Sequence, residues 1–329
     1  ERDPHDNLSI AGAGGEEGPG LVLQAHVDHP AFVVEDVAED GSLDLTFRGG
    51  VRDPYFVGAR IVLLTDDGRR HGAVITASER LEPLRRCRAE LDDASAEVPP
   101  GSIGVWELEP PSIEDGVLHA PAVDDLAGLA AALAAVDAGR HRGTRRDVRL
   151  FLTRAEEIGF VGTVAACESR SLPEGIDLVT LETSRSFADS PIGGGPIVRV
   201  GDRVSTFDPG LTALAGEVAA TIAGEHEDFR WQRRLMAGGA CEATMFVRSG
   251  YRATCLCLPL GNYHNMSELD RVERESPERA TIARELIAVR DFHGLVRLLV
   301  GMAESAPGGD PVRERLSRRY ESLRWVLER

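Results

Sequence analysis

The sequence predicts an α/β protein with a mostly parallel sheet, covered by helices on both faces and interrupted by a small all-β unit. Strand-like and helical segments alternate after Pro121, whereas residues 31–118 hold only short β-rich runs separated by turns. A single apolar run, Leu21–Val27, precedes that unit. Because parallel strands need crossover connections, which helices provide, this alternation favours a parallel sheet. We expect one α/β domain over 1–30 and 119–329, with an inserted β-rich domain over 31–118.

Each predicted element follows from a run of apolar residues. Leu21–Val27 is typical of a buried strand. In the inserted unit, runs such as Phe32–Val34 and Leu43–Phe47 alternate with turn signals, and a polar loop is expected near Arg85–Pro100. The remaining predicted elements are a helix at Leu126–Val136, a strand at Asp147–Thr153, a helix from Gly162, strands at Ile176–Leu181 and Pro196–Val200, a helix at Leu211–Ile222, a strand at Phe229–Leu235, a helix at Cys241–Arg248 and a strand at Ala253–Leu258.

The C-terminal part is predicted to be helical. One helix is expected over Pro277–Ala303, and another begins near Pro311 after a Pro-Gly-Gly break. In the last helix, apolar residues recur at helical spacing between Arg and Glu residues: Val312, Leu316, Tyr320, Leu323 and Leu327. We expect this helix to pack on its own domain, with a subunit contact as the alternative.

Charge and composition exclude several classes of function. The net charge of −17 disfavours nucleic acids and anionic membranes as partners, because both are polyanions. The sequence contains no lysine, which excludes Schiff-base chemistry and lysine-containing phosphate-binding loops. No apolar run has the length needed to cross a bilayer. The five cysteines form no C-x-x-C pair and are expected to be free thiols in a reducing cytoplasm.

The candidate functional residues lie in five segments that each follow or end an apolar strand-like run. These segments are AHVDHP (25–30), AVDDLAG (122–128), TRAEEIGF (153–160), VTLETS (179–184) and GNYHNMSE (261–268). Taken singly, each acid or histidine in them is more often structural than catalytic. Since ligands gather at the carboxyl ends of parallel strands, the five segments are nevertheless expected to converge.

This inventory of histidines and acids suits a pair of divalent ions, because zinc takes imidazole and carboxylate ligands. Asp124 is the expected bridge between the ions. His26 with Glu182 would complete one ion, and Glu157 with His264 the other. Glu156 remains as the general base, and Asp28 is expected to accept the second ring N–H of His26. We regard His29, Asp125, Glu242 and Glu268 as supporting or structural residues.

The order of these motifs resembles that of the co-catalytic di-metal exopeptidases, in particular the glutamyl and deblocking aminopeptidases that form tetrahedral (TET) particles. Two further segments are similar to those of the family, namely GGGPIVRVGDRVSTFDPGLT (193–212) and MAGGACEATMF (236–246). The resemblance covers about Asp6–Ala303. It implies an aminopeptidase that cleaves N-terminal residues from short peptides, with the ligands given above and a cis Asp124–Asp125 peptide.

The resemblance also implies zinc as the metal, with cobalt or manganese as alternatives, and self-association through the β unit, from a dimer up to a dodecamer. The chain departs from the family at several positions. Family members often have Asp at Glu182, Arg at Leu126 and a Thr-Asp step at Cys241-Glu242, and residues 269–285 resemble an insertion. These departures bear on substrate preference and assembly.

Three other functions compete with this interpretation. A related di-metal amidase or dipeptidase would act on capped or non-peptide substrates. A glycosidase would use paired carboxylates without metal, but the surplus of metal ligands and the aromatic content of 5% argue against it. A non-catalytic metal-binding homologue would hold the ions without turnover.

Overall fold

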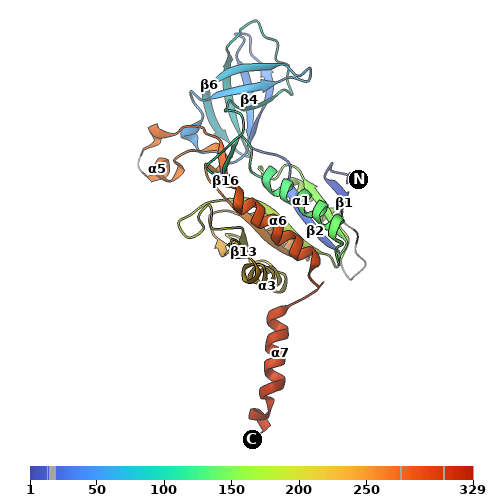
Figure 1. The fold of residues 1–329 in the computed structure, drawn as a ribbon. Helices are drawn as coiled ribbons and strands as arrows, with labels where there is room; N and C mark the ends of the chain where they lie inside the picture. Colours follow the sequence, from blue (N-terminus) through green and yellow to red (C-terminus); the bar gives the residue numbers. More distant parts are fainter. Residues whose placement is uncertain (13, 15–19, 275, 307, 329) are drawn as a thin grey trace.

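The computed structural model describes residues 1–329 except 13, 15–19, 275, 307 and 329. The chain forms an α/β body, a β-barrel at one end of it and a helix that projects from the other end (Figure 1). The barrel is inserted in the sequence between the second strand and the first helix of the body.

A seven-stranded sheet forms the centre of the body, in the order β1-β11-β2-β12-β15-β13-β14. The pairings from β11 through β2 and β12 to β15 are parallel, as is β13 with β14, whereas β1 and β13 run antiparallel to β11 and β15. The expected α/β fold with a mostly parallel sheet agrees with these pairings. The strands are β1 (Leu8–Ala11), β2 (Leu21–His26), β11 (Val148–Thr153), β12 (Asp177–Arg185), β13 (Ile197–Asp202), β14 (Gln232–Met236) and β15 (Arg252–Leu260).

Helices cover both faces of this sheet because its central strands are apolar on both sides. In β2, Leu21 and Leu23 face one hydrophobic cluster and Val22 faces another. The first face carries α1 (Leu126–Arg142), α3 (Pro209–Glu225) and α6 (Val289–Glu304), and the second carries α2 (Val161–Glu168) and α4 (Glu242–Arg248). Figure 1 shows α6 lying between α1 and α3.

Six antiparallel strands close into the barrel, in the order β3-β4-β7-β6-β5-β8. Aromatic residues fill its core, with Phe32 edge-on to Trp106 at 4.8 Å between ring centroids. The strands are β3 (Ala31–Val37), β4 (Leu43–Arg48), β5 (Arg60–Leu64), β6 (Arg70–Leu81), β7 (Leu84–Leu91) and β8 (Ile103–Trp106). The polar loop expected near Arg85–Pro100 is wrong in its first part, which forms β7. Arg85, Cys87 and Ala89 are buried there and alternate with the exposed Arg86, Arg88 and Glu90.

The single helix predicted over Pro277–Ala303 is also wrong. Its first part is a 3₁₀ turn (Pro277–Arg279) followed by β16 (Glu285–Ala288), and α6 begins only at Val289. β16 pairs with β10 (Val117–Ala120), which pairs with β9 (Ser112–Glu114), so that a third sheet lies between barrel and body. This partner strand lies far away in sequence, and a short apolar run does not reveal it. A short helix, α5 (Leu269–Arg274), precedes this region.

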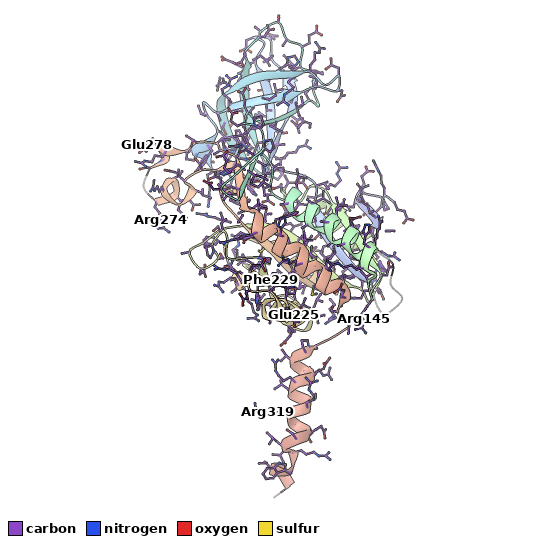
Figure 2. The ribbon with its side chains drawn as sticks, viewed as in Figure 1. Arg145, Glu225, Phe229, Arg274, Glu278 and Arg319 are labelled. Atoms are coloured by element: carbon purple, nitrogen blue, oxygen red, sulfur yellow. The ribbon has the colours of Figure 1, made fainter. Side chains whose placement is uncertain are left out.

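The last helix, α7 (Pro311–Leu323), projects from the body instead of packing along it (Figures 1 and 2). No side chain of α7 is buried, and Leu316 is 59% exposed. Arg315 forms an ion pair of 2.9 Å with Glu217 of α3. The expected packing on the same domain is therefore limited to the start of the helix. Among the described residues, no helix combines the length and the apolar character that crossing a membrane requires.

Candidate metal centre

The five predicted segments converge at one edge of the central sheet, between body and barrel. His26 is the last residue of β2, Glu182 lies in β12, and Glu156 and Glu157 follow β11. Asp124 lies two positions before the start of α1, and His264 lies in a 3₁₀ turn (Tyr263–Asn265) after β15. Because parallel strands end at the same edge, residues distant in sequence meet there.

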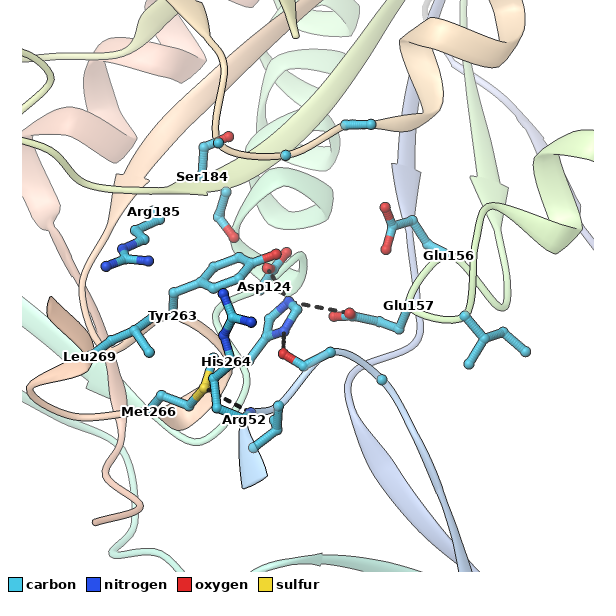
Figure 3. Close-up of a pocket in the computed structure, with 18 of the residues that line it drawn as sticks. Arg52, Asp124, Glu156, Glu157, Ser184, Arg185, Tyr263, His264, Met266 and Leu269 are labelled. Carbon is cyan, nitrogen blue, oxygen red and sulfur yellow. Dashed lines mark hydrogen bonds and ion pairs between the residues drawn. The ribbon is translucent and has the colours of Figure 1, made fainter. Parts of the chain in front are cut away.

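Asp124 lies between the two histidines and directs one carboxylate oxygen toward each. Its Oδ1 is 3.3 Å from His26 Nε2, and its Oδ2 is 3.6 Å from His264 Nε2. Glu182 Oε1 lies 3.8 Å from His26 Nε2. Glu157 Oε2 lies 3.2 Å from His264 Nε2, as Figure 3 shows. The side chains thus form two groups of three potential ligands that share Asp124, and within each group the ligand atoms lie within 4.8 Å of one another.

The chemistry of these groups fits divalent cations. All five side chains are buried, and Asp124 Oδ1 and Glu157 Oε1 have no hydrogen-bond partner in the structure. Burial, reinforced by the charge of Asp124, raises the pKa of Glu157 well above its usual value, and burial raises the pKa of Glu182. Burying several carboxylates together is costly unless cations compensate them. Imidazole nitrogens and carboxylate oxygens are ligands that zinc and related ions accept.

Glu156 lies beside this cluster and faces a cavity of about 660 Å³. The same cavity is lined by Asp124, Glu157, Glu182 and His264. Burial raises the pKa of Glu156 well above its usual value, although the nearby His26 opposes that shift. Figure 3 shows the Glu156 carboxylate on the side of the cavity opposite Tyr263.

The structure gives Asp28 a different contact from the one expected. His26 Nδ1 lies 3.0 Å from the backbone carbonyl oxygen of Asp28 but 3.8 Å from its Oδ1. The Asp28 carboxylate instead accepts hydrogen bonds from the backbone N–H groups of Glu156 and Glu157, at 3.0 and 3.2 Å. The backbone oxygen can therefore fix the His26 tautomer, which leaves Nε2 free to bind a cation.

The neighbours regarded as supporting or structural have distinct contacts. His29 Nδ1 lies 2.7 Å from the carbonyl oxygen of Asp124, and its Nε2 lies 3.0 Å from Asn265 Oδ1. Glu242 is buried beneath the site, where it accepts hydrogen bonds from Gln24, Thr153 and Thr163. Glu268 lies at the surface and pairs with Arg271. The Asp124–Asp125 peptide bond is cis, as the resemblance implied.

Sequence reasoning missed Glu285, a fully buried acid on β16. Its carboxylate accepts backbone hydrogen bonds from Val123, Asp124 and His264. No signal in the sequence pointed to this role. Residues 277–303 are predicted to form one helix, and Glu285 would be an ordinary polar position on it.

The fold and the site together define a class: an α/β protein with an edge cluster of histidines and acids that suits metal-dependent hydrolysis. The sequence profile of the M42 glutamyl aminopeptidases matches residues 7–276, and the chain belongs to this family. It is accordingly a peptidase, a hydrolase of peptide bonds, from a metal-dependent family. The comparison with curated proteins gave no match.

Solved structures with the same fold include two archaeal peptidases. Aminopeptidase APDkam598 from Desulfurococcus kamchatkensis is 20% identical with a TM-score of 0.74, over 93% of this chain and 85% of that chain. The Pyrococcus horikoshii TET1 peptidase, described as assembling into a tetrahedron or a large octahedral shell, is 19% identical with a TM-score of 0.71, over 92% and 88% of the two chains. At these identities the likeness establishes the fold alone.

Proposed function

We propose that the protein is a two-metal aminopeptidase that removes N-terminal residues from short peptides. The observation that carries this proposal is the position of Asp124, which directs one oxygen toward His26 and the other toward His264. A carboxylate in this position suits the bridge between two neighbouring ions. His26 and Glu182 would complete one ion, and Glu157 and His264 the other.

The bound ions would polarise the scissile carbonyl and make water a stronger acid, which is the usual contribution of a two-metal site. Glu156 acts as general base and takes a proton from the attacking water as its oxygen bonds to the carbonyl carbon. When the C–N bond breaks, Glu156 passes that proton to the leaving amine. Asp28 holds the Glu156–Glu157 backbone in place through its two hydrogen bonds.

The cavity suits a small substrate. On the barrel side, the C-terminal end of β4 and the β6–β7 hairpin line it. The loop that carries Glu156 and residues between Tyr263 and Glu273 also line it. A cavity of about 660 Å³ lies within the range for small ligands, so that a short peptide fits better than a folded protein. Zinc fits the donor set best among the metals considered, and cobalt or manganese are the alternatives.

We further propose that the inserted domain, which includes the closed barrel, mediates self-association. One solved relative is described as a dodecamer, and the Pyrococcus horikoshii peptidase as a tetrahedron or octahedral shell. Assemblies from a dimer to a dodecamer are consistent with this likeness. Size-exclusion chromatography with multi-angle light scattering measures the number of subunits of the purified chain, and a monomer at micromolar concentration would contradict this part of the proposal.

The test of function compares two panels of substrates on the metal-loaded protein. Aminoacyl anilides with a free amine are expected to be hydrolysed, chelation is expected to abolish turnover, and zinc, cobalt or manganese are expected to restore it. N-acylated amino acids are the matched panel. Turnover of these capped substrates instead of the free amines would favour the related amidase or dipeptidase, whereas metal binding without any turnover would favour a non-catalytic homologue.

A further inference from the structure

Glu285 is a buried carboxylate that lies between the two loops that carry Asp124 and His264. We propose that Glu285 is a positioning residue that fixes the distance between these two side chains and thereby the place of the ion they share with Glu157. This inference rests on the proposed two-metal site. It assigns to Glu285 a role in metal retention without direct contact to metal or substrate.

Both oxygens of the Glu285 carboxylate are used. Oε2 accepts the backbone N–H of Val123 at 2.7 Å and that of Asp124 at 2.9 Å. Oε1 accepts the backbone N–H of His264 at 2.9 Å. Hydrogen bonds from N–H groups to a carboxylate are stronger than those between neutral groups, and burial increases their strength. One side chain therefore ties together the backbones of two residues proposed as ligands.

The strand that carries Glu285 holds it between these loops. Glu285 pairs with Ala120 of β10, four positions before Asp124, and the next residue, Leu286, forms a bridge with Gly261, three positions before His264. β16 thus lies next to both loops at the point where each turns toward the site. The position of the carboxylate follows from this strand register.

His264 also needs such a constraint because of its backbone conformation. Its φ of 52° and ψ of 38° lie in the left-handed region, which residues with a Cβ rarely adopt. The bond from its N–H to Glu285 and the contact of its Nδ1 with the Gly50 carbonyl oxygen, at 2.8 Å, hold backbone and ring together. Without Glu285 this turn can relax and carry the imidazole away from Asp124 and Glu157.

Replacement of Glu285 by Gln is expected to weaken the binding of the two proposed ions unequally. The Gln amide keeps one acceptor oxygen and adds an NH₂ group that can only donate. If the NH₂ group faced the N–H groups of Val123 and Asp124, two hydrogen bonds would be lost. If it faced the N–H group of His264, only one would be lost. The NH₂ group therefore points at the His264 N–H and displaces that turn. The ion held with His264 should weaken, and the ion held by His26 and Glu182 should change less.

The loops also have a second connection, so that the variant can fold. Asn265 Nδ2 donates to the carbonyl oxygens of Pro121 and Ala283, at 2.9 and 3.1 Å. Asp291 offers a matched control, since it is an equally buried carboxylate that accepts two backbone N–H groups, from Gly193 and Gly195. These glycines lie outside the lining of the cavity. The substitution D291N thus removes the same kind of interaction away from the site.

The experiment titrates zinc into apo wild type, E285Q and D291N against a chromophoric chelator, and records the cobalt absorption spectrum and the Tm of each. We expect E285Q to bind one of two ions at least about 10-fold more weakly, with an altered cobalt spectrum, on the scale usual for groups that orient metal ligands. D291N should lower the Tm and leave both affinities unchanged. E285D keeps a carboxylate that only accepts hydrogen bonds, on a side chain that is one methylene group shorter, and should show the same loss to a smaller degree. This variant tests the proposal if E285Q fails to fold.

Wild-type affinity for both ions in the folded Glu285 variants would overturn the proposal, as would an equal loss of affinity in D291N. These outcomes are separate from the failure of the proposed function. If wild type binds two ions but hydrolyses no peptide substrate, the aminopeptidase assignment fails while the titration still tests Glu285. If wild type hydrolyses peptides and E285Q retains both ions, only the role of Glu285 fails.

Discussion

The carboxylate of Asp28 accepts the backbone N–H of Glu156 at 3.0 Å, and its other oxygen accepts the N–H of Glu157 at 3.2 Å. In D28N the amide group can accept only one of these bonds, so that the loop carrying the proposed general base, Glu156, loses part of its support. We expect kcat to fall about 10-fold or more, with a smaller change in KM. Steady-state kinetics on an aminoacyl anilide measure both. A change confined to KM would contradict this role.

Substitutions of the adjacent residues Glu156 and Glu157 are expected to affect metal retention and turnover differently. E156Q should retain both ions and lose turnover by at least about 10²-fold, which is the usual scale for general-base loss. E157Q removes the charge of a proposed metal ligand beside His264, so that both metal and activity should be lost. Metal analysis after dialysis, together with kcat, separates the two variants. If E156Q remains active, another residue must serve as base.

Removal of metal should lower the stability of the folded chain. Ions that bind only the folded state stabilise it by about 2.7 kcal/mol at a free concentration 100-fold above Kd. Chelation should therefore lower the Tm, and added zinc should restore it. H264A, which lacks one proposed ligand, should show a smaller shift than wild type. An equal shift in both proteins would mean that His264 does not contribute to binding.

The α/β class could be predicted from the sequence because the buried parallel strands form continuous apolar runs, as in β2 and β12. Two elements were misread because tertiary contacts decide them. β7 buries Arg85, Cys87 and Ala89 and exposes Arg86, Arg88 and Glu90, and this arginine-rich alternation looked like a polar loop. β16 is a strand because it pairs with β10, some 165 positions earlier, and its short apolar run fits a helix equally well.

The candidate site was recognisable because its residues follow strands that end at one edge of the sheet, and the structure brings them together there. Hydrogen bonds made by backbone groups were not predictable in the same way. The contact of His26 with the Asp28 carbonyl oxygen and the three bonds to Glu285 depend on loop conformations that side-chain patterns do not encode. The orientation of α7 likewise depends on contacts that its amphipathic pattern leaves open.

Asp177 is expected to stabilise the fold without affecting the chemistry. It begins β12, is 1% exposed, and accepts hydrogen bonds from Arg146 and Arg252, each at 2.6 Å. In D177A, Arg146 and Arg252 lose this buried carboxylate as a partner. We expect the free energy of unfolding to fall by about 3–5 kcal/mol. Glu182 lies five residues further along the strand, about 16 Å away, so that kcat of the folded enzyme should not change.

Urea unfolding of D177A and of a surface control measures this difference. In the control pair, Asp228 and Arg297 are 3.2 Å apart, and Asp228 is 73% exposed. D228A should therefore cost less than about 1 kcal/mol, because water screens and solvates both charges. Equal losses of stability in the two variants would show that burial does not govern the Asp177 contacts. A fall in kcat per folded molecule in D177A would show that the start of β12 is coupled to the candidate metal centre at its other end.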